Sequence, residues 1–213
     1  MNVDENHATR SPDGSPGDTQ LQSTQRAATT PLLVSFAAGS IGAWRIDRTT
    51  PVAGDSLAGA PRLNVIESGN SMNGSTAAWT LRGSTSNTRY TTRSEVEQLA
   101  SRQEGLNRPS ATRAALIPIR KRDAWRTMAQ DERRAVFEEQ SRHIAIGLRY
   151  LPGVARRLHH SRELGEAFDF LTWFEYPPEA SGLSEDLVRT LRATPEWRFV
   201  DRDVGIRLSL PSP

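Results

Sequence analysis

The stretch that decides the fold, residues 113–160, reads RAALIPIRKRDAWRTMAQDERRAVFEEQSRHIAIGLRYLPGVARRLHH. Its first part, 113–120, is apolar with little alternation, which is typical of a strand covered on both faces. A T-x-x-Q capping-box spacing at Thr127 then predicts the start of one long helix, which Pro152 ends. The run at 153–160 predicts a second strand. The stretch therefore predicts a strand, a long helix and a strand.

The pattern continues toward the C-terminus. Residues 167–176 predict a strand, 183–194 an amphipathic helix and 196–210 a final alternating strand. The order strand, helix, strand, strand, helix, strand is that of a ferredoxin-like, split βαβ unit. We expect this unit to cover residues 109–213.

The preceding segment, residues 32–108, is shorter and richer in Gly, Ser and Asn, and it predicts a truncated, degenerate copy of the same unit. Its expected strands are 32–36, 41–47, 62–66 and 78–84, and its expected helix is 93–106. Two such units side by side would join their sheets into a barrel. The predicted fold class is therefore α+β, with two ferredoxin-like βαββαβ units forming an α+β barrel.

The N-terminal segment, residues 1–31, has no aromatic residue and no periodic apolar face. Such a segment buries too little surface to offset its ordering entropy, so we expect a disordered tail. The start of the chain has no secretory signal pattern, and no apolar run is long enough to cross a bilayer. We therefore expect a cytoplasmic protein without membrane contact.

Composition excludes several kinds of chemistry. The 213 residues include no cysteine, which excludes disulfides, zinc–thiolate sites, iron–sulfur clusters and a cysteine nucleophile. The sequence also lacks the motifs typical of zinc hydrolases, serine hydrolases, P-loops and dinucleotide-binding loops. The net charge is only +2, and acidic residues are interspersed with the arginines, so we expect no nucleic-acid partner.

One histidine is a candidate ligand. On a continuous helix His143 would share a stripe with Val136, Gln140 and Gly147, and the missing side chain of Gly147 would let a flat ligand approach. A neutral imidazole on such a face can ligate a haem iron. From periodicity alone, the ordinary interpretation of a half-buried, hydrogen-bonded helix residue is favoured.

A strand pair supplies a candidate cation. Alternation puts Arg156 and Leu158 on one face of their strand, and Thr172 and Phe174 on one face of the next. If these faces coincide, Arg156 is a lone guanidinium over an apolar pocket, suited to a small anion. If the register differs, Arg156 points to solvent, and one sequence does not fix the register.

Two further features concern basic residues. Lys121 is the only lysine among the 27 Lys and Arg residues, so its site either needs a compact ammonium group or keeps lysine by chance. His159 and His160, which lie beside arginines, suggest a solvated turn, and we assign them no catalytic role.

These segments resemble the chlorite dismutase family. The resemblance runs from TLRGSTSNTRY at 80–90 to VDRDVGIRL at 200–208 and is carried by long ungapped strings such as QDERRAVFEEQSRHIA and LGEAFDFLTWFEY. It extends more weakly back to Leu32. The short N-terminal half is similar to the smaller, dimeric lineage of the family, which implies a homodimer.

The resemblance implies haem b as the cofactor, with iron bound by His143. It implies that Glu196 hydrogen-bonds the proximal imidazole and that Arg156 is the distal catalytic arginine. Further haem contacts carried over from the family are Lys121 and Trp125 near the propionates, with Leu158, Thr172 and Phe174 as the distal wall. Lys121 would partner either Glu196 or a propionate.

The implied reaction converts chlorite to chloride and dioxygen, a detoxification in which Arg156 retains the hypochlorite-level fragment near the iron. One position departs from the family: Arg126 stands where many relatives carry a second tryptophan. We expect this exchange to affect packing at the haem edge or a subunit contact.

Two alternatives remain at this stage. A coproheme decarboxylase of haem biosynthesis shares the fold, but its family usually has a neutral residue at the position of Arg156. A non-catalytic, haem-binding or haem-free ferredoxin-like dimer is the second alternative, and the visible spectrum after haem reconstitution would discriminate it.

Overall fold

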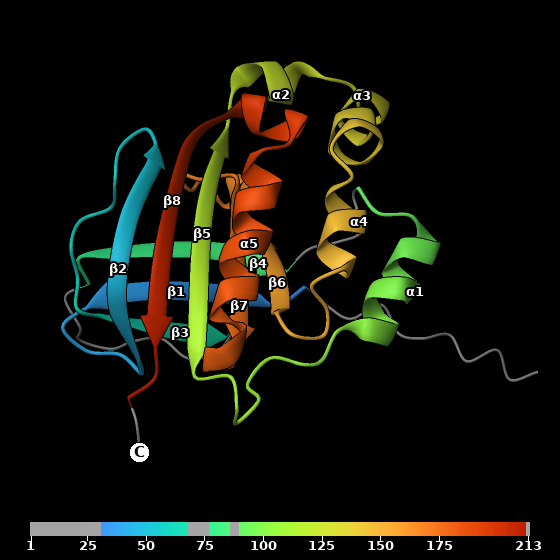
Figure 1. Ribbon diagram of the computed structural model, residues 1–213. Coiled ribbons are helices and arrows are strands. Elements are labelled where there is room, and N and C mark those ends of the chain that lie inside the picture. The colour runs from blue at the N-terminus through green and yellow to red at the C-terminus, as the bar shows by residue number, and fades with distance from the viewer. Residues whose placement is uncertain (1–30, 68–76, 86–89, 212–213) are drawn as a thin grey trace, which may run out of the picture. The chain divides into compact units, whose positions relative to one another are not determined.

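The computed structural model describes residues 31–67, 77–85 and 90–211, which form an α+β protein around a closed antiparallel barrel (Figure 1). The predicted tail, residues 1–31, falls outside these residues except for Pro31. The described strands are β1 (Leu33–Gly39), β2 (Trp44–Ala53), β3 (Arg62–Glu67), β4 (Trp79–Thr85), β5 (Arg113–Lys121), β6 (Ala155–His160), β7 (Phe170–Tyr176) and β8 (Val200–Ser209). The described α-helices are α1 (Arg93–Arg102), α2 (Asp123–Thr127), α3 (Gln130–Arg134), α4 (His143–Leu148) and α5 (Ser181–Arg192).

The barrel confirms the predicted class. Its strand order is β1-β3-β2-β8-β5-β7-β6-β4, and β4 closes the ring by pairing with β1. Each half of the chain therefore contributes four adjacent strands, in the matching orders β4-β1-β3-β2 and β8-β5-β7-β6. Every pairing is antiparallel.

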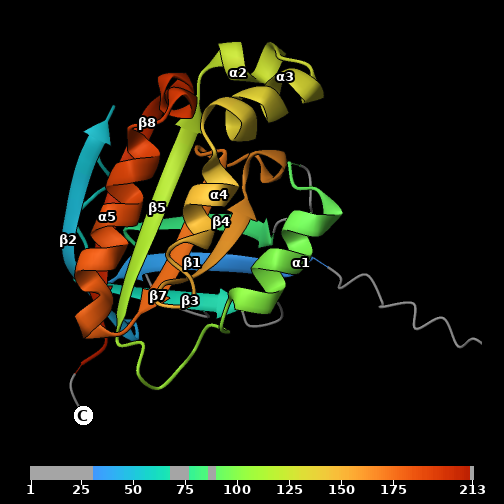
Figure 2. The same ribbon diagram turned by 45° about the vertical axis from the view of Figure 1, so that its right-hand side comes forward.

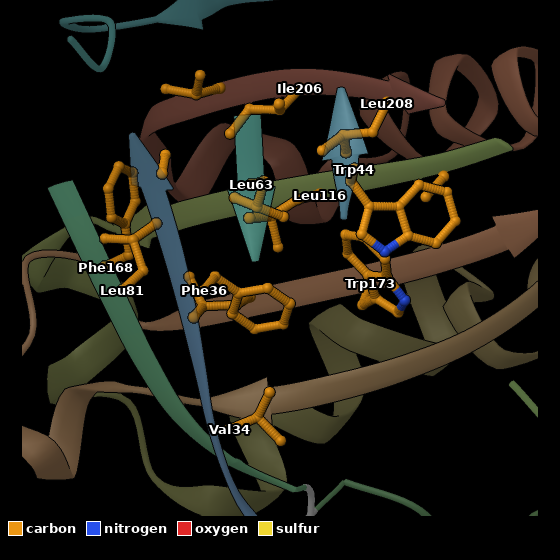
Figure 3. Packing of buried hydrophobic residues seen from close by; sticks show 14 residues of the cluster. Val34, Phe36, Trp44, Leu63, Leu81, Leu116, Phe168, Trp173, Ile206 and Leu208 are labelled. Atoms are coloured by element: carbon orange, nitrogen blue, oxygen red, sulfur yellow. The ribbon is translucent and has the colours of Figure 1, made fainter. Parts of the chain in front are cut away.

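The barrel interior is the main apolar core. Figure 3 shows Phe36, Trp44 and Trp173 together inside it, with Leu116 and Ile206 from the C-terminal strands. The ring centroids of Trp44 and Trp173 are 5.4 Å apart in an edge-to-face arrangement. Burying one such side chain contributes about 1.5–3 kcal/mol, so this cluster is a principal source of stability.

A second apolar cluster covers the outside of the barrel. Side chains alternate along β5, so Ala114 and Leu116 face the interior whereas Ile117 and Ile119 face outward. Leu187, the centre of the predicted apolar stripe of α5, packs on this outer face. Both views show α5 lying along β5, with α4 and α1 side by side beyond it (Figure 2). Among the described helices, none is long and apolar enough to span a bilayer.

The prediction of one long helix from Thr127 is wrong. The segment is divided into α2, α3, a π-helical stretch at Ala135–Gln140 (η1) and α4. The division before α4 occurs because Arg142 adopts a left-handed backbone conformation, with φ 52°. The hydrophobic period continues across the break, and sequence periodicity therefore does not detect it.

Two further predictions need correction. The residues before β8 form a short 3-10 turn, Pro195–Phe199 (η4), so Glu196 does not lie on the final strand. His159 and His160 belong to β6 and are buried, because pairing of β6 with β7 turns His159 into the barrel. The solvated turn follows them, at η2 (Arg162–Leu164).

The buried His159 predicts an acid-sensitive fold. Burial lowers the pKa of His159 from 6.5 to about 4, despite a hydrogen bond to the carbonyl of Leu171. The unfolded chain therefore binds a proton that the folded chain excludes, and stability is lost as the pH falls from 6.5 toward 4. We expect about 2 kcal/mol of this loss by pH 5.

Urea unfolding at pH 7 and pH 5 measures this contribution. The parent should lose about 2 kcal/mol more between the two pH values than the His159→Leu variant, which cannot titrate at this position. Equal losses in the two proteins would contradict a neutral buried His159.

Candidate functional site

A pocket lies on the outer face of β5, β6 and β7, beneath α4, α5, η1 and η4. Its walls are mainly apolar and aromatic, and polar side chains reach it from α4, β6, β7 and η4. The lining residues are Tyr90, Ile117, Ile119, Trp125, Phe137, His143, Arg156, Leu158, Phe170, Thr172, Phe174, Val188, Leu191, Glu196 and Trp197. Apolar walls with a few convergent polar groups are typical of a ligand or cofactor site.

The local backbone fixes where His143 lies. The left-handed Arg142 ends the preceding turn, so His143 is the first residue of α4. The carboxylate of Glu138 accepts hydrogen bonds from the backbone N–H groups of Ile144 at 2.7 Å and Ala145 at 3.2 Å, and thereby caps the new helix. The ring of Phe137 stacks on the imidazole with a centroid separation of 4.4 Å. The imidazole therefore has a defined orientation in the pocket.

A buried hydrogen-bonded chain holds the imidazole from behind. Nδ1 of His143 lies 2.7 Å from Oε2 of Glu196, and Nζ of Lys121 lies 2.6 Å from Oε1. The side chains of Lys121 and Glu196 are 1% and 4% exposed, and the hydroxyl of Ser141 accepts the backbone N–H of Glu196 at 2.8 Å. We name this chain, Lys121–Glu196–His143, the proximal relay.

The charge of Glu196 fixes the tautomer of the His143 imidazole. Burial by itself would raise the pKa of Glu196, but the charges of His143 and Lys121 and their hydrogen bonds lower it to about 2. An ionised carboxylate only accepts hydrogen bonds, so Nδ1 of His143 is the donor. Nε2 is then the ring nitrogen available to a ligand.

Arg156 supplies the positive charge in the pocket. In β6 it lies opposite Phe174 of β7, so the register puts it on the aromatic face. Burial lowers the pKa of Arg156 to about 10, and only the distant charge of Glu138 opposes this shift. Among the described residues, no group lies within hydrogen-bond distance of its guanidinium. A half-buried cation without a partner is costly, so the pocket favours an anionic ligand.

Gly147 has a steric role next to that cation. A Cβ atom at Gly147 would overlap the guanidinium of Arg156, which lies against this part of α4. The sequence pattern predicted that the missing side chain of Gly147 admits a flat ligand. Here it makes room for Arg156.

Trp125 and Arg126 occupy one edge of the pocket. The ring of Trp125 lies 4.4 Å from Nζ of Lys121, within cation–π distance, and also lines the pocket. Arg126 forms ion pairs with Asp123 at 2.5 Å and with the buried Asp169 at 3.1 Å. Asp169 also accepts the backbone N–H of Lys121 at 2.7 Å, so Arg126 is connected to the strand end that carries Lys121.

Comparison with known proteins identifies the family. A family model described as chlorite dismutase matches residues 63–209. The chain belongs to the chlorite dismutase family.

Solved structures agree with this family. The crystal structure of a dimeric chlorite dismutase from Nitrobacter winogradskyi is 53% identical, covers 83% of this chain and 99% of that chain, and has a TM-score of 0.76. Two mutant chlorite dismutases from Candidatus Nitrospira defluvii are 20% identical, cover 84% of this chain and 91% of theirs, and have TM-scores of 0.58 and 0.61. At 20% identity these two support the fold alone. No curated protein sequence matches the chain significantly.

The structure brings most of the residues singled out in the sequence into one pocket. Those that line it are Trp125, His143, Arg156, Leu158, Thr172, Phe174 and Glu196. Lys121 does not line it and lies behind Glu196, which is one of the two partners expected for this lysine. Among the described residues, no group of three or more His, Cys, Asp or Glu side chains could hold a metal ion.

Sequence reasoning missed eight lining residues: Tyr90, Ile117, Ile119, Phe137, Phe170, Val188, Leu191 and Trp197. Simple alternation along β5 could have found Ile117 and Ile119. The stacking of Phe137 on His143 depends on the break before α4. No local sequence signal predicts this break.

The proximal relay predicts a large penalty when one partner is removed. Glu196→Gln leaves the buried ammonium of Lys121 without a counter-charge, so the free energy of unfolding of the haem-free protein should fall by about 3–5 kcal/mol. The double variant Lys121→Met with Glu196→Gln should recover much of this loss, because it removes the uncompensated charge. Chemical denaturation measures both.

A matched control is the exposed ion pair of Arg45 with Asp47. Arg45→Gln should change the free energy of unfolding by less than about 1 kcal/mol. A loss of similar size for Glu196→Gln and Arg45→Gln would contradict the importance of the proximal relay.

Proposed function

We propose that this protein decomposes chlorite to chloride and dioxygen with haem b as its cofactor. The observation that carries the proposal is an imidazole fixed by the proximal relay in an apolar pocket that also contains the unpaired guanidinium of Arg156. Membership of the chlorite dismutase family and the 53% identical dimeric chlorite dismutase support the same reaction.

The pocket residues fit haem b. Nε2 of His143 is the protein atom that would bind the haem iron. The apolar side chains of β5 and α5, including Ile117, Ile119 and Leu191, suit the faces of a porphyrin. Trp125, at the pocket edge, would contact its periphery. Arg156 lines the same pocket, with its guanidinium against Gly147.

The reaction is balanced without a co-reactant, since one chlorite anion yields one chloride anion and one dioxygen molecule. When bound, the haem iron supplies the redox chemistry that cleaves the Cl–O bond. The role of Arg156 is to bind the chlorite anion and to hold the chlorine oxyanion after cleavage, through a fixed charge and forked donors. Retention keeps the two fragments close enough for the oxygen–oxygen bond to form.

The other proposed site residues act on this step in two ways. Glu196, with Lys121 behind it, keeps Nδ1 of His143 as a hydrogen-bond donor and thereby raises the basicity of Nε2. Leu158, Thr172 and Phe174 form the wall around Arg156, where exclusion of water strengthens the attraction between guanidinium and oxyanion.

We also propose that the chain forms a homodimer and consists of two ferredoxin-like halves, 32–108 and 109–213. The dimeric relative supports the assembly. The matching strand orders β4-β1-β3-β2 and β8-β5-β7-β6 support the two halves. The first half is truncated between its first two strands. Only residues 40–43 connect β1 to β2, whereas several helices lie between β5 and β6 in the second half.

An oxygen electrode tests the proposed reaction directly. Haem-reconstituted protein given chlorite should evolve one dioxygen per chlorite consumed, and His143→Ala should lose both the Soret band and oxygen evolution. Reconstituted protein that decarboxylates coproheme and evolves no oxygen would favour the alternative enzyme. Absence of a Soret band in the parent would favour the non-catalytic module.

The adjacent residues Arg156 and Arg157 provide a variant and its control for the proposal that Arg156 retains the chlorine oxyanion. Arg156→Ala should keep haem but release more free hypochlorite, detected by a chlorination trap, and lose activity after fewer turnovers. Arg157→Ala is the control, since Arg157 lies on the opposite face of β6 and pairs with Glu67 at 2.6 Å. Equal hypochlorite release from the two variants would contradict the role of Arg156.

A further inference from the structure

A second pocket adjoins the candidate haem pocket at one edge. Its volume is about 190 Å³, and it shares the side chains of Tyr90, Trp125 and Phe170 with the haem pocket. We name it the edge pocket. Its charged lining residues are Arg126, Arg133, Arg162, Glu163 and Asp169. The roles proposed above for His143 and Arg156 leave this space unused.

Arg133 brings a positive charge to the edge pocket without a counter-charge. Its Nε donates to the backbone carbonyl of Trp125 at 3.1 Å, and its Nη2 donates to that of Arg126 at 2.7 Å. Among the described residues, Arg133 forms no ion pair. A guanidinium has five N–H donors, so three remain for another partner. The two carbonyls therefore orient the guanidinium and leave its charge uncompensated.

One buried carboxylate holds two more guanidinium groups at the edge pocket. Asp169 is 6% exposed and accepts hydrogen bonds from Nη2 of Arg126 at 3.1 Å and from Nη1 of Arg162 at 3.2 Å. It also accepts the backbone N–H of Lys121 at 2.7 Å, which anchors it to the end of β5. Asp169 thus positions two arginines but balances the charge of only one.

The charge balance and exposure favour an anionic ligand. Three of the charged lining residues are arginines and two are acidic, so the lining carries a net positive charge. Asp123, the second partner of Arg126, does not line the pocket, and water screens it because its side chain is 90% exposed. The side chains of Arg126 and Arg162 are 25% and 54% exposed, so an anion can reach them.

A carboxylate or another small oxyanion fits these donors. Its oxygens are acceptors only, and the planar fork of a guanidinium can bind two of them at once. Lys121 does not compete for such a ligand, because its side chain is 1% exposed and its ammonium is paired with Glu196. The edge pocket is therefore the polar, cationic extension of a mainly apolar pocket.

We propose that the edge pocket binds a carboxylate or a small oxyanion, with Arg133 as its principal donor and Arg126 and Arg162 beside it. Two sources carry this chemistry. One is a propionate of the haem, which rests on the proposed function, and the other is a free oxyanion from solution. A propionate would arrive with the ring, and this attachment raises its effective concentration at the site.

Acetate tests the site in the haem-free, full-length protein. Because the carbonyl of Trp125 holds the Nε–H of Arg133, this group should give a resolved ¹⁵N–¹H signal, identified by its loss in Arg133→Gln. We expect acetate to shift this signal saturably. Arg122 is the matched control, since its Nε also donates to a carbonyl, that of Val200, and it lines neither pocket. Its signal should show no saturable shift.

Haem and its dimethyl ester, which lacks the two carboxylates, distinguish the sources. If a propionate occupies the site, the ester should pass from the parent to apomyoglobin about tenfold faster than haem does. This ratio should fall below about threefold in Arg133→Gln and stay unchanged in Arg122→Gln. Structural damage in Arg133→Gln would affect both porphyrins alike, so the ratio isolates the carboxylate contact. Equal rates in the parent, together with the saturable acetate shift, identify a free oxyanion.

A second variant keeps the test decisive if Arg133→Gln does not fold. Arg162→Gln changes a largely exposed side chain and should lower the ratio of the two release rates at least about twofold. The proposal is overturned if acetate does not shift the Arg133 signal saturably, if the Arg122 signal shifts in the same way, or if Arg133→Gln and Arg122→Gln lower the ratio equally. A protein that binds no haem would contradict the proposed function, and the acetate titration would still decide this proposal.

Discussion

The buried contact of Glu196 with Lys121 and His143 is the interaction on which the candidate site depends. It joins the end of β5, the start of α4 and the turn before β8, three segments that are far apart in the chain. The ammonium of Lys121 and the hydrogen bond from His143 keep the buried carboxylate ionised, and the ionised carboxylate determines which nitrogen of His143 carries the donated proton. Removing any one member leaves a buried charge or an unoriented ring, so fold and site are stabilised by the same contact.

The alternation of side chains along β6 and β7 divides the molecule into two chemical environments. Arg156 faces the outer pocket, with an unpaired positive charge, whereas its neighbour Arg157 turns to the barrel and pairs with Glu67. His159, two residues further on, is neutral and buried in the interior. One pair of strands thus places a cation on its outer face and a neutral imidazole on its inner face. A shift of one residue in the strand register would turn Arg156 into the barrel and Arg157 toward the outer pocket.

The break before α4 shows how a local irregularity serves the site. A continuous helix would satisfy the backbone of 141–145 by itself and would leave Glu138 free. Instead Arg142 takes a left-handed conformation, and the carboxylate of Glu138 binds the exposed N–H groups of α4. Ser141, just before the break, binds the backbone of Glu196. The interruption therefore places His143 at the start of α4 and Ser141 against Glu196.

The sequence by itself determined the α+β class, most strand positions and, through resemblance to a family, seven of the fifteen residues that line the pocket. Hydrophobic alternation and turn residues are local, so β5, β6, β7 and α5 could be read directly from them. Tertiary structure alone decided the strand order, the break at Arg142 and the burial of His159. The physical reason is that these depend on pairing and hydrogen bonds between residues distant in the chain, which no local period encodes. Arg156 illustrates the division, because its alternation was visible in the sequence but only the pairing of β6 with β7 selected the face.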